Sequence, residues 1–159
     1  MAFYQVFDLQ SFGDADEENI KTMIEGFALG ECFKEILENY HRDLMAMDFE
    51  RLMGSGERIW SAFSYITSPE MRNFMLGDMR EAIYKKDQEK LIHMHLIFLR
   101  KCEILRRELE DYLQTPVPSP NIKECVKECL KVLKEMNDSK VEVEGEVKNN
   151  TFCAGCWIF

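Results

Sequence analysis

Apolar side chains recur along this chain at intervals of three and four residues, the spacing that places them on one face of an α-helix. Such stripes cover residues 20–44, 59–66, 71–83, 91–112 and 122–136. The pattern predicts an all-α protein, a bundle of about five helices with a long fourth helix and a flexible C-terminal tail.

Helix starts are indicated by residues whose side chains can accept hydrogen bonds from free backbone N–H groups. These residues are Asp14 or Asp16 before the first stripe, Ser68 before Pro69, and Asn121 three residues before Glu124. Glycine weakens a helix by about 1 kcal/mol relative to alanine, so Gly26 and Gly30 indicate a kink or a close helix contact. Gly54-Ser55-Gly56 predicts a turn or a break in a long helix.

The fourth helix is the most regular, because residues 87–113 contain neither glycine nor proline. Its apolar seam alternates steps of four and three residues, as in helices packed nearly side by side. The seam consists of Leu91, His95, Phe98, Cys102, Leu105, Leu109 and Tyr112. At 1.5 Å per residue this helix is about 40 Å long. Its seam can pair within the chain or between two copies, so a homodimer through the fourth helix stays open.

Both ends of the chain differ from the stripes. Residues 1–13 are apolar and aromatic, and we expect an extended arm that either packs on the domain or binds a partner through Phe3, Tyr4 and Phe7. After Asn137 apolar and acidic residues alternate, and the sequence then becomes polar. The alternation would suit one β-strand, but a lone strand would have no sheet to join. We therefore expect residues 14–137 to form the bundle and residues 138–159 a flexible tail.

The last four residues, Cys156-Trp157-Ile158-Phe159, resemble a prenylation box, in which a cysteine thiolate attacks an isoprenoid diphosphate. Phenylalanine at the last position favours a geranylgeranyl group, while Trp157 departs from the aliphatic consensus. One lipid chain binds membranes only marginally, and Cys153 is a candidate for palmitoylation as the second signal. If the box is not processed, Trp157 and Phe159 are candidates for docking in a hydrophobic groove.

The overall charge limits the partners. The formal net charge is -9, which argues against nucleic acid as an electrostatic partner. The first residues lack the pattern of a signal peptide, and no apolar run approaches the roughly 20 residues that cross a bilayer. We therefore expect a cytoplasmic protein, or one attached to the cytosolic face of a membrane, with reduced cysteines.

The cysteines and histidines suggest two weaker hypotheses. Four thiolates could form a zinc site from Cys125, Cys129, Cys153 and Cys156. We expect no metal there, because Cys125 and Cys129 already lie on the apolar stripe of a helix, where reduced cysteines are common. His95 in the seam is expected to be a core or interface histidine, and His41 beside Arg42 is expected in solvent.

No nucleophile elbow, phosphate-binding loop or paired-carboxylate motif is present, so the sequence favours a non-enzymatic protein. Three hypotheses follow. The first is a helical adaptor or scaffold tethered by prenylation, with no cofactor other than the covalent isoprenoid. The second is a soluble module that binds other proteins through its helical faces. The third is a bundle that binds a lipid or another apolar ligand in an internal cavity.

Overall fold

The computed structural model describes residues 3–155, with side chains as far as Gly145. The helices are α1 (Glu17–Leu29), α2 (Cys32–Met45), α3 (Phe49–Phe63), one continuous rod of α4 (Pro69–Asn73), η2 (Phe74–Met79) and α5 (Arg80–Lys85), then α6 (Gln88–Leu113) and α7 (Ile122–Gly155). A single 3-10 turn, η1 (Leu9–Phe12), precedes them. The prediction of an all-α protein is confirmed. Within this part of the chain, no helix is long and apolar enough to cross a membrane.

Side-chain caps fix the helix starts. The carboxylate of Asp16, and not that of Asp14, accepts from the backbone N–H of Asn19 at 2.9 Å to begin α1. Ser68 and Asn121 cap α4 and α7 as expected, accepting from backbone N–H groups three residues on at 3.3 and 3.2 Å. Asp87 does the same for α6. Each cap satisfies a donor that the first helical turn leaves free.

The first apolar stripe forms two helices rather than one. α1 ends at Leu29, and Glu31 takes a left-handed conformation with φ 65° before α2 begins. A Cβ atom at Gly30 would lie 2.5 Å from the carbonyl oxygen of Gly26, so only glycine fits this corner. The break raises the number of helices to six and makes α6 the helix that was expected to be fourth.

The expected break at Gly54-Ser55-Gly56 is wrong, because α3 runs through all three residues. A Cβ atom at Gly56 would lie 3.0 Å from the Trp60 ring and 3.3 Å from the Ile83 side chain of α5. The Ser55 hydroxyl donates to the buried carboxylate of Asp43 on α2. The small residues therefore allow close helix contacts and do not end the helix.

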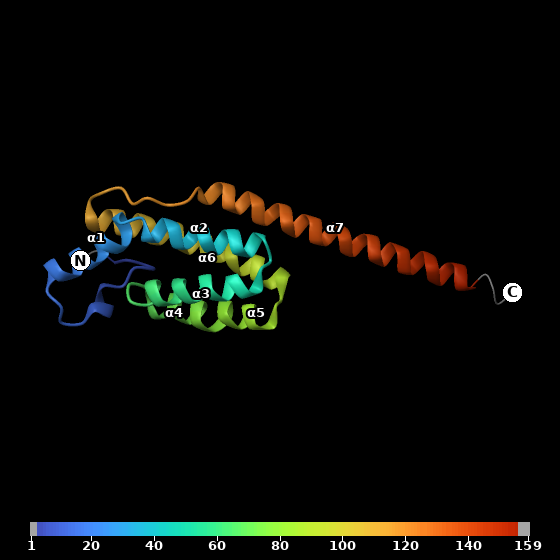
Figure 1. Ribbon diagram of the computed structural model, residues 1–159, viewed down its shortest axis with the longest axis horizontal. Helices are drawn as coiled ribbons and strands as arrows, with labels where there is room; N and C mark the ends of the chain where they lie inside the picture. Colours follow the sequence, from blue (N-terminus) through green and yellow to red (C-terminus); the bar gives the residue numbers. More distant parts are fainter. Residues whose placement is uncertain (1–2, 156–159) are drawn as a thin grey trace.

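The core lies between α1, α2, α3, the α4–η2–α5 rod and α6 (Figure 1). The α6 seam faces this core, and its members from Leu91 to Leu109 are fully buried. The seam is thus used within the chain, which is the physical reason for its heptad spacing. The early part of α7 lies against α6 and α2 and buries a second, smaller cluster that includes Cys129.

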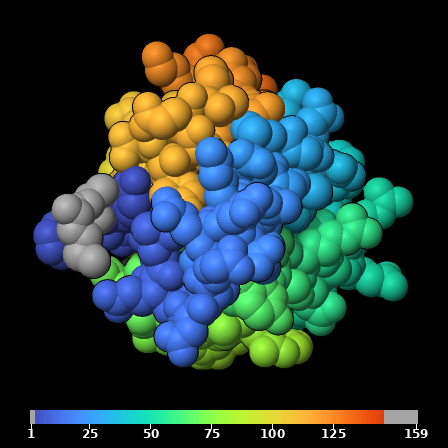
Figure 2. Space-filling model, turned by 90° about the vertical axis from the view of Figure 1, so that its left-hand side faces the viewer, coloured from blue at the N-terminus to red at the C-terminus, as the bar shows by residue number. Residues whose placement is uncertain are grey.

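The N-terminal arm is packed on the bundle, and Figure 2 shows its residues over one end of it. Val6 and Phe7 are 3% and 2% exposed. The Glu108 carboxylate of α6 accepts from the backbone N–H groups of Gln5, Val6 and Phe7, the last two at 2.9 and 2.7 Å. Phe7 also forms an isolated antiparallel bridge with Thr67. The Glu108 carboxylate therefore accepts hydrogen bonds from three backbone N–H groups of the arm, in the place that a neighbouring strand would take in a sheet.

The largest difference from the expected fold is at the C-terminal end. In place of a tether without regular structure from residue 138, α7 continues as a helix to Gly155. The segment contains no proline and, before its last residue, one glycine, and Lys140 pairs with Glu89 of α6 near the point of departure. Beyond that point α7 projects away from the bundle (Figure 1). Residues 156–159 lie outside the described residues.

Candidate functional site

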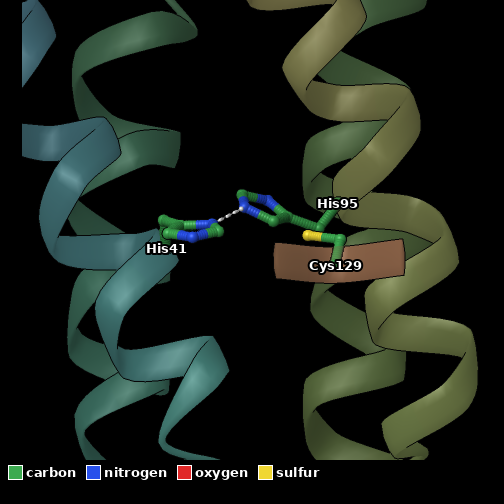
Figure 3. Close-up of side chains that lie close together, drawn as sticks. All are labelled: His41, His95 and Cys129. Atoms are coloured by element: carbon green, nitrogen blue, oxygen red, sulfur yellow. Dashed lines mark hydrogen bonds between the residues drawn. The ribbon is translucent and has the colours of Figure 1, made fainter. Parts of the chain in front are cut away.

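Three side chains that can bind metals meet inside the molecule, each from a different helix (Figure 3). They are His41 of α2, His95 of α6 and Cys129 of α7. One ligand atom from each lies within 4.8 Å of the other two. His95 and Cys129 are fully buried, and His41 is 8% exposed. We call this group the His–His–Cys cluster.

Helical spacing brings these residues to the interior. His95 occupies one position of the α6 seam, between Leu91 and Phe98. His41 lies four residues after Leu37 and three before Leu44, both buried, so it belongs to the inward face of α2. The expectation that His41 faces solvent is therefore wrong. That expectation was based on the neighbouring Arg42, but adjacent residues of a helix point in different directions.

The hydrogen bonds of the two histidines define one consistent proton arrangement. His41 Nδ1 lies 2.9 Å from His95 Nε2, and His41 Nε2 lies 3.2 Å from the Glu128 carboxylate. The carboxylate accepts only, so His41 Nε2 carries a proton and its Nδ1 accepts from His95 Nε2–H. His95 Nδ1 is then an unprotonated nitrogen with no partner among the described residues. The opposite arrangement would bury an unsatisfied N–H at that nitrogen, which costs more.

The surroundings keep the His95 ring and the Cys129 thiol neutral. Burial, and then the proximity of His41, lowers the pKa of His95 to about 3. Burial, with smaller contributions from Cys125 and Glu128, raises the pKa of Cys129 to about 12. The Tyr40 ring centroid lies 5.2 Å from that of His95. A buried thiol with a raised pKa is a poor nucleophile, so the arrangement is unsuited to covalent catalysis.

The structure tests only part of the four-cysteine zinc hypothesis. Cys125 is 8% exposed and lies one turn before Cys129 on the same face of α7. The side chain of Cys153 and the whole of Cys156 lie outside the described residues. Among described side chains, Cys129 joins two histidines rather than other thiols. The sequence placed His95 and Cys129 on the apolar stripes of two different helices. His41 lies 54 positions before His95, and Cys129 lies 34 positions after it, so no local spacing could show that the three side chains meet.

The candidate partner-binding residues have different environments. Phe3 is 95% exposed, whereas Phe7 is buried in the core and is not available to a partner. The Tyr4 hydroxyl donates to the Asp111 carboxylate at 2.9 Å. Trp157 and Phe159 lie outside the described residues. Of these five candidates, Phe3 alone is shown with a free aromatic surface.

The sequence did not single out the projecting part of α7 as a surface. Every described side chain from Asn137 to Gly145 is exposed. Val141 and Val143 are 68% and 59% exposed, and Leu130 nearer the bundle is 53% exposed. Val141 and Val143 are two positions apart, so their side chains point to nearly opposite sides of α7 and do not form one continuous apolar patch.

Comparisons with protein-family models, with curated proteins and with solved structures found no match for this chain. No relative therefore contributes to the functional argument. That argument depends on the C-terminal sequence, the projecting helix and the His–His–Cys cluster.

Proposed function

We propose that the protein is a non-enzymatic helical adaptor, tethered to the cytosolic face of a membrane by geranylgeranylation of Cys156. The observation that carries the proposal is the departure of α7 from the bundle a few turns before the Cys156-Trp157-Ile158-Phe159 box. A helix that projects presents its end to a modifying enzyme and then to a bilayer. The bundle is left free to bind a protein partner.

The projecting helix sets the distance between bundle and membrane. Residues 138–155 span about 27 Å as a helix, at 1.5 Å per residue. The same residues fully extended would reach roughly 60 Å, at about 3.3 Å each. The helical form thus acts as a spacer of defined length, whereas an extended tether would allow a wide range of positions.

A second membrane signal accompanies the isoprenoid in this proposal. One lipid chain gives only weak, reversible binding. Glu142 and Glu144 on the projecting helix are exposed and would be repelled by anionic lipids, so a polybasic signal is absent from this segment. Cys153, three residues before Cys156, supplies a thiol for palmitoylation.

The first test is the intact mass of the protein purified from eukaryotic cells. The proposal requires Phe159 to be the last residue before processing. Prenylation joins a geranylgeranyl group to the Cys156 thiolate and releases diphosphate. Proteolysis then removes Trp157, Ile158 and Phe159, and methylation of the new C-terminal carboxylate completes the processing. Cys156→Ser should abolish the mass change and move the protein from the membrane to the soluble fraction.

Two matched variants make the test specific. Phe159→Ser should exchange the geranylgeranyl group for a farnesyl group, because the last residue selects the enzyme. Cys153→Ser should keep the isoprenoid and weaken membrane retention. An unmodified C-terminus in cells with active prenyl transferases would contradict the proposal.

The second candidate function is a soluble protein-binding module without a lipid. The exposed Leu130 and Val141 favour it, because they lie about three turns apart on the same side of α7 whether or not Cys156 is modified. It predicts that truncation after Met136 abolishes capture of a partner while membrane fractionation stays unchanged. By contrast, the many Phe and Met residues pack the core, with Met71, Met75 and Met79 at most 1% exposed. This packing gives no support to an apolar ligand cavity.

A further inference from the structure

We propose that His41, His95 and Cys129 bind one thiophilic metal ion with a filled d shell, Zn²⁺ or Cu⁺. The inference is independent of the proposed lipid anchor. Two imidazoles and one thiolate are donors that both ions accept, whereas harder ions such as Mg²⁺ and Ca²⁺ prefer oxygen. The three donors come from α2, α6 and α7, so a bound ion would join three helices.

The distances require only a small movement. The two facing nitrogens are 2.9 Å apart, and all three donor atoms lie within 4.8 Å of one another. With metal–nitrogen bonds near 2.0 Å and a metal–sulfur bond near 2.3 Å, donors around one ion are about 3.3 to 3.8 Å apart. The rings would separate by about half an ångström, and the sulfur would move inward.

Glu128 supplies an outer contact of the kind that metal-bound histidines use. Its carboxylate accepts from His41 Nε2–H, which leaves the lone pair of His41 Nδ1 directed at His95 and available to an ion. His95 must move its proton from Nε2 to Nδ1, where no described residue accepts it. Glu128 is thus the main outer contact of the site, and it also lies on the half-exposed side by which an ion would enter.

Charge balance permits both ions. Binding converts the Cys129 thiol to a thiolate and releases one proton to solvent. Cu⁺ with this thiolate is neutral, and three ligands satisfy it. Zn²⁺ with the thiolate carries one positive charge, which the nearby Glu128 carboxylate offsets, and a water molecule at the His41 side would complete four ligands. A neutral centre is needed because an isolated charge in an apolar core is costly.

The test uses the full chain with Cys153→Ser and Cys156→Ser, so that the C-terminal thiols cannot bind metal. Zn²⁺ affinity is measured by competition with a chromogenic chelator, and Cu⁺ affinity without oxygen by competition with bicinchoninate. Co²⁺ serves as a spectroscopic substitute for zinc, with a thiolate charge-transfer band as the signature. We expect one ion per chain and a melting temperature that falls when a chelator removes it.

Variants locate the site. Cys129→Ala should weaken binding at least 100-fold and remove the cobalt–thiolate band. Glu128→Gln should weaken binding by about 10-fold, as expected for an outer contact. Cys125→Ala is the matched control, because it changes the thiol one turn away, and its affinity should stay within threefold. Circular dichroism checks that each variant is folded; if Cys129→Ala is not, His41→Phe takes its place.

The outcomes separate the alternatives. Stoichiometric binding of Zn²⁺ or of Cu⁺, lost on Cys129→Ala and kept on Cys125→Ala, supports the proposal and identifies the ion. The wild-type chain is measured in parallel. An ion that binds the wild-type chain but neither the double-serine chain nor Cys125→Ala would instead establish the four-cysteine site and overturn this one. Binding of neither ion, or equal binding by a folded Cys129→Ala variant, also overturns it.

Discussion

Helix α6 and the outer half of α7 are stabilised in two different ways. α6 buries a seam along its whole length, and nine of its side chains lie in the interior. Residues 137–145 of α7 bury none. Tertiary packing stabilises α6, whereas the outer part of α7 depends on its own helix propensity and on the packed turns before it. A substitution in the α6 seam should therefore lower the free energy of unfolding of the bundle, whereas a substitution in residues 137–145 of α7 should not.

The largest expected effect comes from truncating the seam. Phe98→Ala removes a fully buried ring that lies beside Tyr40, Phe63 and His95. It should lower the free energy of unfolding by about 3 to 5 kcal/mol, measured by chemical denaturation. Val143→Ala on the outer part of α7 is the control, and its effect should stay within about 0.5 kcal/mol. Equal losses from both variants would mean that α7 packs over its whole length.

An intermediate effect is expected where the arm meets α6. Glu108→Gln removes the charge and one of the two acceptor oxygens that serve Gln5, Val6 and Phe7. It should lower the free energy of unfolding by about 1 to 3 kcal/mol, because a buried backbone donor loses its partner. Amide exchange at Val6 and Phe7 should accelerate. Glu89→Gln, at a partly exposed position near the other end of the same helix, should leave that exchange unchanged.

The smallest effect compares two glycines. Alanine at Gly145 meets no atom within 4 Å and should stabilise the outer part of α7 by about 1 kcal/mol. Hydrogen exchange over residues 138–155 should slow, while the melting temperature of the bundle stays the same. Gly30→Ala should destabilise the bundle, because its Cβ atom would clash with the carbonyl oxygen of Gly26. If Gly145→Ala also shifted bundle melting, the two regions would not be independent.

Periodic stripes and caps made the bundle predictable, because both depend on residues close in sequence. Asp16, Ser68 and Asn121 lie at helix starts, and the seam of α6 is buried as its spacing indicates. The prediction failed at Gly56, where the reason for a small residue is a ring in contact and not a turn. It failed again after residue 137, where alternating valines and glutamates were compatible with more than one backbone conformation.

The His–His–Cys cluster could be predicted only in part. A signal for His41 was present, since it lies between Leu37 and Leu44 at seam spacing, but the charged neighbour was given more weight. Cys129 and His95 were each assigned to a buried face. Which polar groups meet across three helices depends on how the helices rotate and slide against one another, and local periodicity does not fix that.

The hydrogen bonds between Glu108 and the N-terminal arm also determine when the arm can fold during synthesis. The arm leaves the ribosome before its partner Glu108, which follows about a hundred residues later. At about 5 to 20 residues per second, the arm waits roughly 5 to 20 seconds for α6 to emerge. Until then Val6 and Phe7 are exposed to chaperones and to neighbouring chains. The arm is therefore synthesised before α6 but can take its final position only after α6 has emerged.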